Sequence, residues 1–399
     1  MSTTQSPPAR LPSLSGFGFV AICMVLISHI GISLVLRVDP AAQTLWSYDY
    51  KLGVMGFTFF FVITGFALAW VHNSDVDAPR FWRRRAARVF PVHVITLVAS
   101  LLLALGTGVA IAGWRTIANL LLIQNWIPDQ EAVLTANPNG PTWALSCALL
   151  FYATFPWINR LVRRIRPERL WAPALAVIVL LVAVPFLAKL LPIEPLLVRT
   201  TDSWLQTWFV GYIPVTRLLE FLLGVFVARM VATKRWHGPG VVVSVLLSLA
   251  GLAISAHFLE DNAGFAVTAA PLALLVAAAA KREYAGKRTF FGTRPMVALG
   301  GIAFSVYLVH WIVISYGPLD TANPDIWTTP SSLGSALGNA ALTFVAILVL
   351  GWLLSVLVER PALRLLGGRR RVAPPAVLDP RHGSSAVPAE SKDGDTRAA

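Results

Sequence analysis

Apolar runs, separated by short polar segments, extend along most of the chain. A helix needs roughly 20 mostly apolar residues to cross a bilayer. Ten runs meet or approach this length, so the pattern predicts an all-α, polytopic membrane protein of about ten transmembrane helices. We predict the spans at 17–36, 53–72, 89–113, 142–161, 170–190, 211–231, 240–258, 264–280, 296–316 and 335–358.

Basic residues are concentrated in alternate loops between these predicted spans. The opposite loops hold few basic residues and most of the loop acids. Because cytoplasmic loops carry an excess of Lys and Arg, we predict that both termini lie in the cytoplasm. The basic residues of the predicted cytoplasmic loops are Arg80, Arg83, Arg84, Arg85, Arg88, Arg160, Arg163, Arg164, Arg166, Arg169, Arg229, Lys234, Arg235, Lys281, Arg282, Lys287, Arg288 and Arg294.

The composition agrees with lipid as the main solvent. Hydrophobic residues make up 56% of the chain and charged residues 13%, whereas soluble domains typically carry about 25% charge. The net charge of +13 lies in short loop bursts, which favours membrane orientation over nucleic-acid binding. The chain divides into a cytoplasmic N-terminus at 1–16, a transmembrane domain at 17–366 and a polar tail at 367–399, which we predict to be disordered and cytoplasmic.

Few ionisable residues lie inside the predicted spans, and each is a candidate for function because it is costly in hydrocarbon. His29 lies well inside the first span. A histidine can act as a general base near neutral pH, although a hydrogen bond between helices is the simpler alternative. Arg217 and Glu220 are spaced i,i+3 on one helix face, so we predict a structural ion pair. Both cysteines, Cys23 and Cys147, lie inside apolar runs and predict neither a disulfide framework nor a zinc site.

Several segments carry glycine, aromatic and charged residues in an ordered series. They contain Leu14, Gly16, Phe17 and His29; Thr64 within GFTFFFVITGFALAW at 56–70; Arg85, Arg88 and Pro91; Pro141, Trp143, Leu145, Ser146, Phe151, Tyr152 and Pro156; Arg217 and Glu220; Ser305, Tyr307, Leu308 and His310; and Glu359 with Pro361. The series covers about 1–366 and resembles the acyltransferase 3 family of membrane O-acyltransferases, which O-acylate bacterial surface polysaccharides, peptidoglycan and sugars on macrolide antibiotics.

Two positions depart from the pattern of that family. The usual first-span arginine is Gly18, and the usual fourth-span glutamate is Ala148. Gly18 and His29 share one helix face about 16 Å apart, so the cation expected beneath the histidine is missing. Two charged positions of the family's presumed active centre are therefore neutral here.

The resemblance implies a membrane enzyme that moves an acyl group from acyl-CoA to a hydroxyl of a sugar, a lipid or a secondary metabolite, with no metal. It implies a cytoplasmic donor and a cavity in which a histidine is the base or an acyl relay. Cys147, beside the lost glutamate, is an alternative thiol nucleophile. The residues that the resemblance assigns are His29, Tyr152, His310 and Ser146 for catalysis, and Arg85 and Arg88 for the donor phosphates.

The implied partners are a small-molecule or lipid-linked substrate and membrane lipids, with no nucleic acid. We predict a multi-pass protein of a bacterial inner membrane, because the Ala, Arg, Val and Leu content resembles that of a high-GC bacterium, in which such enzymes often serve secondary metabolism. Two alternatives stay open. One is a relative adapted to cyclise or isomerise an apolar prenyl or terpenoid substrate without acyl-CoA, although the DDxxD signature of ionising terpene cyclases is missing. The other is a non-catalytic binding or transport protein.

Overall fold

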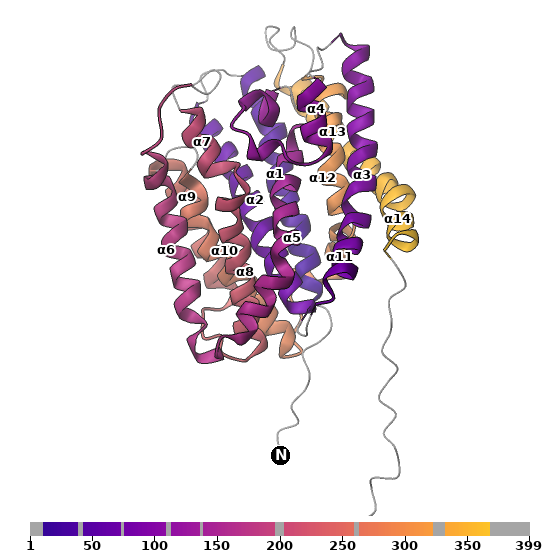
Figure 1. The fold of residues 1–399 in the computed structure, drawn as a ribbon. Helices are drawn as coiled ribbons and strands as arrows, with labels where there is room; N and C mark the ends of the chain where they lie inside the picture. The colour runs from indigo at the N-terminus through magenta and orange to yellow at the C-terminus, as the bar shows by residue number, and fades with distance from the viewer. Residues whose placement is uncertain are drawn as a thin grey trace, which may run out of the picture.

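Helices make up nearly all of the regular structure. The structure, a computed structural model, describes residues 11–38, 43–72, 76–108, 113–135, 139–195, 203–258, 263–321 and 332–367. The first ten residues and the predicted tail beyond residue 367 lie outside the described residues. Figure 1 shows the long helices running side by side as one bundle, with α6 and α9 at one edge and α3 and α14 at the opposite edge.

The helices follow the predicted order of apolar runs. Short 3₁₀ or π turns connect some of them, notably η1 (Gln124–Trp126), η2 (Glu131–Thr135), η3 (Gly140–Thr142) and η8 (Ser355–Glu359). The helices are α1 (Pro12–Val38), α2 (Gln43–Val71), α3 (Ala78–Gly106), α4 (Gly113–Leu120), α5 (Trp143–Arg164), α6 (Trp171–Ala188), α7 (Trp204–Gly211), α8 (Pro214–Ala232), α9 (Val241–Phe258), α10 (Gly264–Tyr284), α11 (Arg294–Gly300), α12 (Ala303–Tyr316), α13 (Leu333–Leu354) and α14 (Arg360–Leu365).

The number of membrane-spanning helices agrees with a polytopic all-α protein. Within the described residues, 8 helices are long and apolar enough to cross a bilayer, or up to 9 if the bent pair α11 and α12 forms one span. The remaining predicted span coincides with α9, whose apolar stretch Val241–His257 is shorter. The fold class predicted from the apolar runs is therefore confirmed, and each predicted run coincides at least in part with a helix, although residues 109–112 of the run at 89–113 lie outside the described residues.

The ninth predicted span is bent. α11 and α12 pass the span test together but meet at an angle of 59°. The consecutive glycines Gly300 and Gly301 lie at the break, and a Cβ atom on Gly300 would lie 2.0 Å from the carbonyl oxygen of Ser15 on α1. Because glycine permits this close backbone approach, α1 packs directly against the bend. The span predicted at 296–316 therefore corresponds to two helices with a bend between them, which the apolar pattern alone does not reveal.

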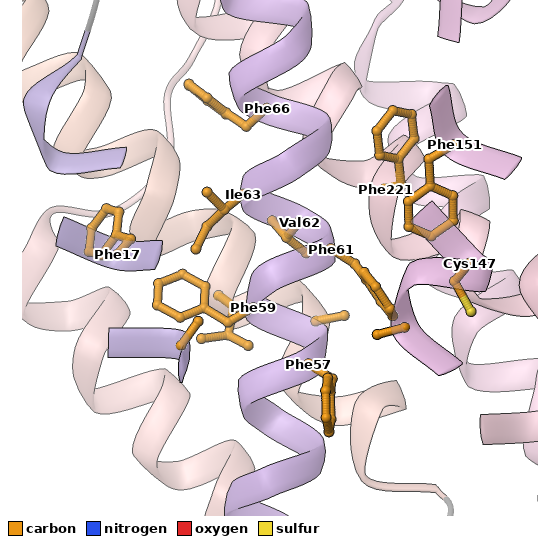
Figure 2. Close-up of a cluster of buried hydrophobic side chains, with 14 of the residues drawn as sticks. Phe17, Phe57, Phe59, Phe61, Val62, Ile63, Phe66, Cys147, Phe151 and Phe221 are labelled. Carbon is orange, nitrogen blue, oxygen red and sulfur yellow. The ribbon is translucent and has the colours of Figure 1, made fainter. Parts of the chain in front are cut away.

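α2 lies at the centre of the core. A Cβ atom on Gly65 of α2 would lie 2.0 Å from the carbonyl oxygen of Phe221 on α8, so a glycine is needed where these two helices touch. Beside this contact, Phe61 of α2 meets Phe151 of α5 with ring centroids 5.1 Å apart, and Phe151 stacks on Phe221 at 4.8 Å. Figure 2 shows these rings on one side of α2 and Phe17 on the other. α2 thereby holds α1, α5 and α8 around one packed interior.

The direction of the helices provides a first testable prediction. Basic residues occupy the last turns of α5, α8 and α10, all of which the positive-inside pattern assigns to the cytoplasm. A reporter inserted near Arg164, and one fused after Arg371 outside the described residues, should both report cytoplasm. A reporter at Asp261, which also lies outside the described residues, should report the opposite side. The measurement is a paired set of periplasmic and cytoplasmic reporter activities, and a consistent reversal would overturn the orientation.

Candidate active site

One cavity in the described part of the chain contains the first-span histidine, and we call it the histidine cavity. Its volume of about 170 Å³ is smaller than the roughly 300–1,000 Å³ of sites that enclose a drug-sized ligand, so it has room for a reacting group rather than for a whole substrate. The walls come from six helices and from the loop segment between α4 and α5, so residues far apart in the sequence meet there. Its lining residues are Ser28, His29, Tyr50, Gly53, Val54, Phe57, Val133, Leu134, Gly140, Pro141, Trp143, Gly211, Tyr212, Arg217 and Trp311.

Two histidines are in contact at the wall of this cavity. Nδ1 of His29 lies 3.0 Å from Nε2 of His310, and the two rings stack with centroids 5.2 Å apart and an interplanar angle of 10°. The ring of Trp311 also contacts that of His29 in a T-shaped arrangement, with ring centroids 5.3 Å apart. The sequence named both histidines separately, and α12 brings them together. The interhelical contact expected of His29 as a packing residue is present, and the same contact orients the ring beside a cavity.

The hydrogen bonds of His310 determine which nitrogens carry protons. Nδ1 of His310 is hydrogen-bonded to the backbone carbonyl of Tyr307, and a carbonyl oxygen only accepts. In a neutral His310 the proton therefore lies on Nδ1, and Nε2 accepts from the Nδ1–H of His29. This assignment places the basic lone pair of a neutral His29 on its Nε2. The pair thus has the arrangement of a base oriented by a second group.

Backbone contacts hold α12 in place beside the cavity. The hydroxyl of Tyr307 donates a hydrogen bond to the carbonyl of Pro141. The side chain of Asn139 donates from Nδ2 to the carbonyl of Leu308 at 2.9 Å. Both contacts tie α12 to the turn that precedes α5. Asn139 was not a candidate in the sequence, because a loop asparagine gives no periodic signal.

A buried ion pair lies at the edge of the same cavity. Nε of Arg217 is 3.4 Å from a carboxylate oxygen of Glu220, and the two side chains are 3% and 0% exposed. The guanidinium also lies over the rings of Phe61 and Phe265, 5.4 and 5.2 Å from their centroids. Aromatic faces attract a cation, so they compensate part of its lost hydration. The predicted i,i+3 pair is therefore present, and Arg217 additionally lines the histidine cavity.

A second cavity, which we call the arginine cavity, lies between α3 and α5. Asp77 caps α3 by accepting a hydrogen bond from the backbone N–H of Arg80, and Arg85 follows two turns into the helix. Tyr152, which the sequence assigned to the catalytic cavity, lies here beside Arg85 and not beside His29. The lining residues are Trp82, Arg85, Ala86, Val89, Phe90, Leu122, Leu145, Leu149, Tyr152, Ala153 and Trp157.

Arg85 provides positive charge to an otherwise mostly apolar wall. Its guanidinium lies over the rings of Phe81 and Tyr152, 5.4 and 5.6 Å from the centroids. Its Nε is buried and has no hydrogen-bond partner among the described residues. Nearby, burial and the positive charges of Arg85 and Arg84 lower the pKa of His72, just beyond the end of α2, to about 4. His72 is thus neutral at physiological pH, and the arginines set the local charge.

Arg88 differs from Arg85 although it lies one helical turn away. Nε of Arg88 is 3.3 Å from a carboxylate oxygen of Glu359, and Ser305 donates a hydrogen bond to the other oxygen at 2.8 Å. The guanidinium also lies over the ring of Phe304 at 5.7 Å. Arg88 therefore joins α3 to α12 and η8. It does not line the arginine cavity, so the two arginines predicted to act together point to different surroundings.

Ser146 and Cys147 are buried in the first turns of α5 and line neither cavity. The hydroxyl of Ser146 has no hydrogen-bond partner among the described residues. The thiol of Cys147 lies 3.5 Å from the carbonyl of Tyr212 and 3.6 Å from Nδ2 of Asn125. Asn125 also donates to the carbonyls of Trp143 and Tyr212, at 3.0 and 2.8 Å. The thiol is thus enclosed by a structural network, which does not favour its use as the nucleophile.

Gly18 and Ala148, the two positions that depart from the pattern of the family, have different surroundings. A Cβ atom on Gly18 would meet nothing within 4 Å, so the helix surface is open there. Ala148 is 3% exposed, inside the packing of α5. A glutamate at 148 would enter packed surroundings, whereas an arginine at 18 would enter open space. Among the described residues, no group of three or more His, Cys, Asp or Glu side chains has the arrangement of a metal site.

Comparisons with known proteins identify relatives over nearly the whole chain. A family model described as an acyltransferase domain, acyltransferase 3, matches residues 12–360. The acyltransferase MdmB of Streptomyces mycarofaciens is 35% identical over 380 residues, covering 92% of this chain and 96% of the relative. The O-acetyltransferase OatA of Staphylococcus aureus is 24% identical over 338 residues, covering 77% of this chain but 51% of the relative. No solved structure matches.

Proposed function

Because this chain belongs to the acyltransferase 3 family and is a multi-pass membrane O-acyltransferase, we propose that it takes its acyl group from a cytoplasmic acyl-CoA. The acceptor in this proposal is a hydroxyl of a small molecule or a lipid-linked sugar, and the location is a bacterial inner membrane. Relatives named acyltransferases favour this reaction over the cyclase and transport alternatives. The observation that carries the proposal is the His29–His310 pair at the wall of a cavity.

The reaction follows from the position of the basic nitrogen. Nε2 of His29 takes the proton of the acceptor hydroxyl while the oxygen attacks the thioester carbonyl carbon of the donor. The carbon–sulfur bond then breaks, and the proton on His29 passes to the leaving thiolate. His310 accepts a hydrogen bond from Nδ1–H of His29 throughout, so it fixes the ring and stabilises the transient imidazolium. His310 is thus a positioning residue in this mechanism.

The arginine cavity supports the donor side of the proposal. A guanidinium matches the geometry of a phosphate group, and Arg85 contributes such a group at the end of α3 that the charge pattern assigns to the cytoplasm. The nearby His72 is neutral and adds no positive charge of its own, so the arginines supply the cationic groups at this end of the cavity. Arg88 already contacts Glu359, so we assign phosphate recognition to Arg85 and helix pairing to Arg88. Tyr152 contributes a ring face to Arg85 in this assignment.

A matched pair of substitutions separates donor binding from topology. Arg85→Lys keeps a positive charge, and therefore the orientation, but removes the fork that matches a phosphate. We expect roughly tenfold weaker binding of labelled acyl-CoA, the loss of about one charge-assisted hydrogen bond. Arg88→Lys is the control and should bind the donor as wild type does, because its charge remains available to Glu359. Equal donor binding in wild type and Arg85→Lys would leave Arg85 with only a topological role.

The proposed reaction itself is tested by release of free CoA. Membranes containing the full chain are incubated with acyl-CoA and candidate hydroxyl acceptors, and free thiol and acylated acceptor are measured together. Equal amounts of the two products are expected, because each transfer releases one thiol. Tight binding of an apolar substrate with no thiol release from any acyl-CoA would overturn the choice of donor.

A further inference from the structure

Arg217 lines the histidine cavity, whereas its partner Glu220 does not. The arginine side chain is 3% exposed, and its Nε, 3.4 Å from the carboxylate, is enclosed by protein. The two terminal nitrogens of the guanidinium have no hydrogen-bond partner among the described residues. The carboxylate is 0% exposed. The pair is thus neutral as a whole, with its positive end at the cavity and its negative end in the packed interior.

Aromatic rings connect this guanidinium to the histidine pair. The guanidinium lies 6.0 Å from the ring centroid of Trp143, and the rings of Trp143 and Phe57 are 4.6 Å apart. Phe57 in turn contacts Tyr307 at 6.1 Å, and the Tyr307 ring lies 5.5 Å from that of His310. Trp143 and Phe57 both line the histidine cavity. The base and the guanidinium therefore belong to the wall of one small cavity, and a reacting group inside it can meet both.

The terminal nitrogens of Arg217 need an acceptor that the described residues do not supply. A buried donor without a partner is costly, and the ring faces around the guanidinium compensate only part of that cost. Because Glu220 already balances the charge, the site does not require an anion in its resting state. A fixed dipole with its positive end at a cavity stabilises negative charge that develops there during a reaction.

We propose that Arg217 is a catalytic residue that binds the carbonyl oxygen of the donor thioester and stabilises the oxyanion formed from it. The inference rests on the proposed function. The acceptor oxygen bonds to the carbonyl carbon, its proton moves to Nε2 of His29, and the carbonyl electron pair moves onto the oxygen facing Arg217. That pair returns as the carbon–sulfur bond breaks, and the leaving thiolate takes the proton from His29. The cavity volume of about 170 Å³ suits these reacting atoms.

The test removes the charge pair without leaving either member alone. Arg217→Met combined with Glu220→Leu keeps similar side-chain volumes, so this double variant should fold and insert. It should bind labelled acyl-CoA as wild type does, because Arg85 lies in the other cavity. Its maximal rate of transfer should fall by roughly 10²–10³-fold, the usual cost of removing one donor to an oxyanion. Arg235→Met with Glu168→Leu is the matched control, because that exposed pair lines neither cavity.

A single substitution provides a second measurement that does not depend on the double variant. Arg217→Lys keeps a positive charge beside Glu220, so the unfolding temperature should stay close to that of wild type. A lysine ammonium is a point charge on a single stem, whereas the arginine fork contacts the carboxylate through Nε and keeps its terminal nitrogens for the cavity. We expect the maximal rate of transfer to fall by roughly tenfold or more, with acyl-CoA binding unchanged.

The outcomes separate the inference from the proposed function. A folded double variant, or an Arg217→Lys protein, that transfers at the wild-type rate with saturating acceptor would overturn the inference and leave the reaction standing. A loss of transfer that more acceptor restores would assign Arg217 to acceptor binding and would also overturn it. If the double variant does not fold, the Arg217→Lys rate decides. If wild type releases no CoA from any acyl-CoA, the proposed function is wrong and the inference falls with it.

Discussion

His29→Ala is expected to lower acyl transfer by 10²–10⁴-fold, the usual contribution of a general base. The reason is the geometry at the histidine cavity, where His29 is the base and His310 fixes its ring. Membrane insertion should be unchanged, because removing a polar group from a span does not oppose insertion. The measurement is acyl transfer per amount of inserted protein.

Substitution of His310 tests whether this second histidine acts through His29. His310→Ala should lower transfer less than His29→Ala, and the double variant should be no slower than His29→Ala alone, because a positioning residue has nothing to position once the base is gone. His257→Ala is the matched control, since His257 on α9 pairs with Tyr48 and lines neither cavity. Transfer by His29→Ala within about tenfold of wild type is too high for the loss of a central base.

Glu220→Ala is expected to remove most of the folded protein. The substitution leaves the guanidinium of Arg217, 3% exposed, without its carboxylate partner. Breaking a buried pair in this way costs about 3–5 kcal/mol, which is a large part of a typical free energy of unfolding of about 5–15 kcal/mol. The measurement is the amount of detergent-extracted, monodisperse protein and its unfolding temperature.

Two further variants distinguish a buried pair from a general charge effect. Replacing both members, by Arg217→Met with Glu220→Leu, should recover folding, since apolar residues of similar volume can replace a buried pair. Glu168→Ala is the control, because Glu168 and Arg235 form an exposed pair at 2.6 Å, and such pairs contribute about 0–1 kcal/mol. A Glu220→Ala protein as stable as wild type, or a double variant as poor as the single one, would contradict a structural role for the pair.

The lengths of the apolar runs were sufficient to predict the fold class. A span must be long and apolar because no water satisfies its backbone in the bilayer, so each span is recorded in its own contiguous sequence. The same cost of polar groups in lipid singled out His29, Arg217 and Glu220 without any knowledge of their neighbours. The structure places Arg217 and Glu220 in contact and His29 at a cavity. These residues could be singled out in advance because the length of an apolar run and the cost of a polar residue within it can both be read from one segment of sequence.

Contacts between side chains of helices distant in sequence could not be predicted from the spacing of residues along one helix. Arg85 and Arg88 are one turn apart, yet only the packing of η8 and α12 decided that Arg88 contacts Glu359 while Arg85 lines a cavity. Tyr152 and Ser146 share α5 with the expected catalytic motif, but the rotation of that helix placed Tyr152 beside Arg85.

The sequence by itself determined which segments cross the membrane and which polar residues require a partner there. Only the tertiary structure decided that His29 of α1 meets His310 of α12 across 281 positions of the chain. It also decided that Arg85 of α3 and Tyr152 of α5 line one cavity between these two helices. The physical reason is that the cost of a residue in lipid depends on that residue alone, whereas its partner depends on how helices distant in sequence pack together.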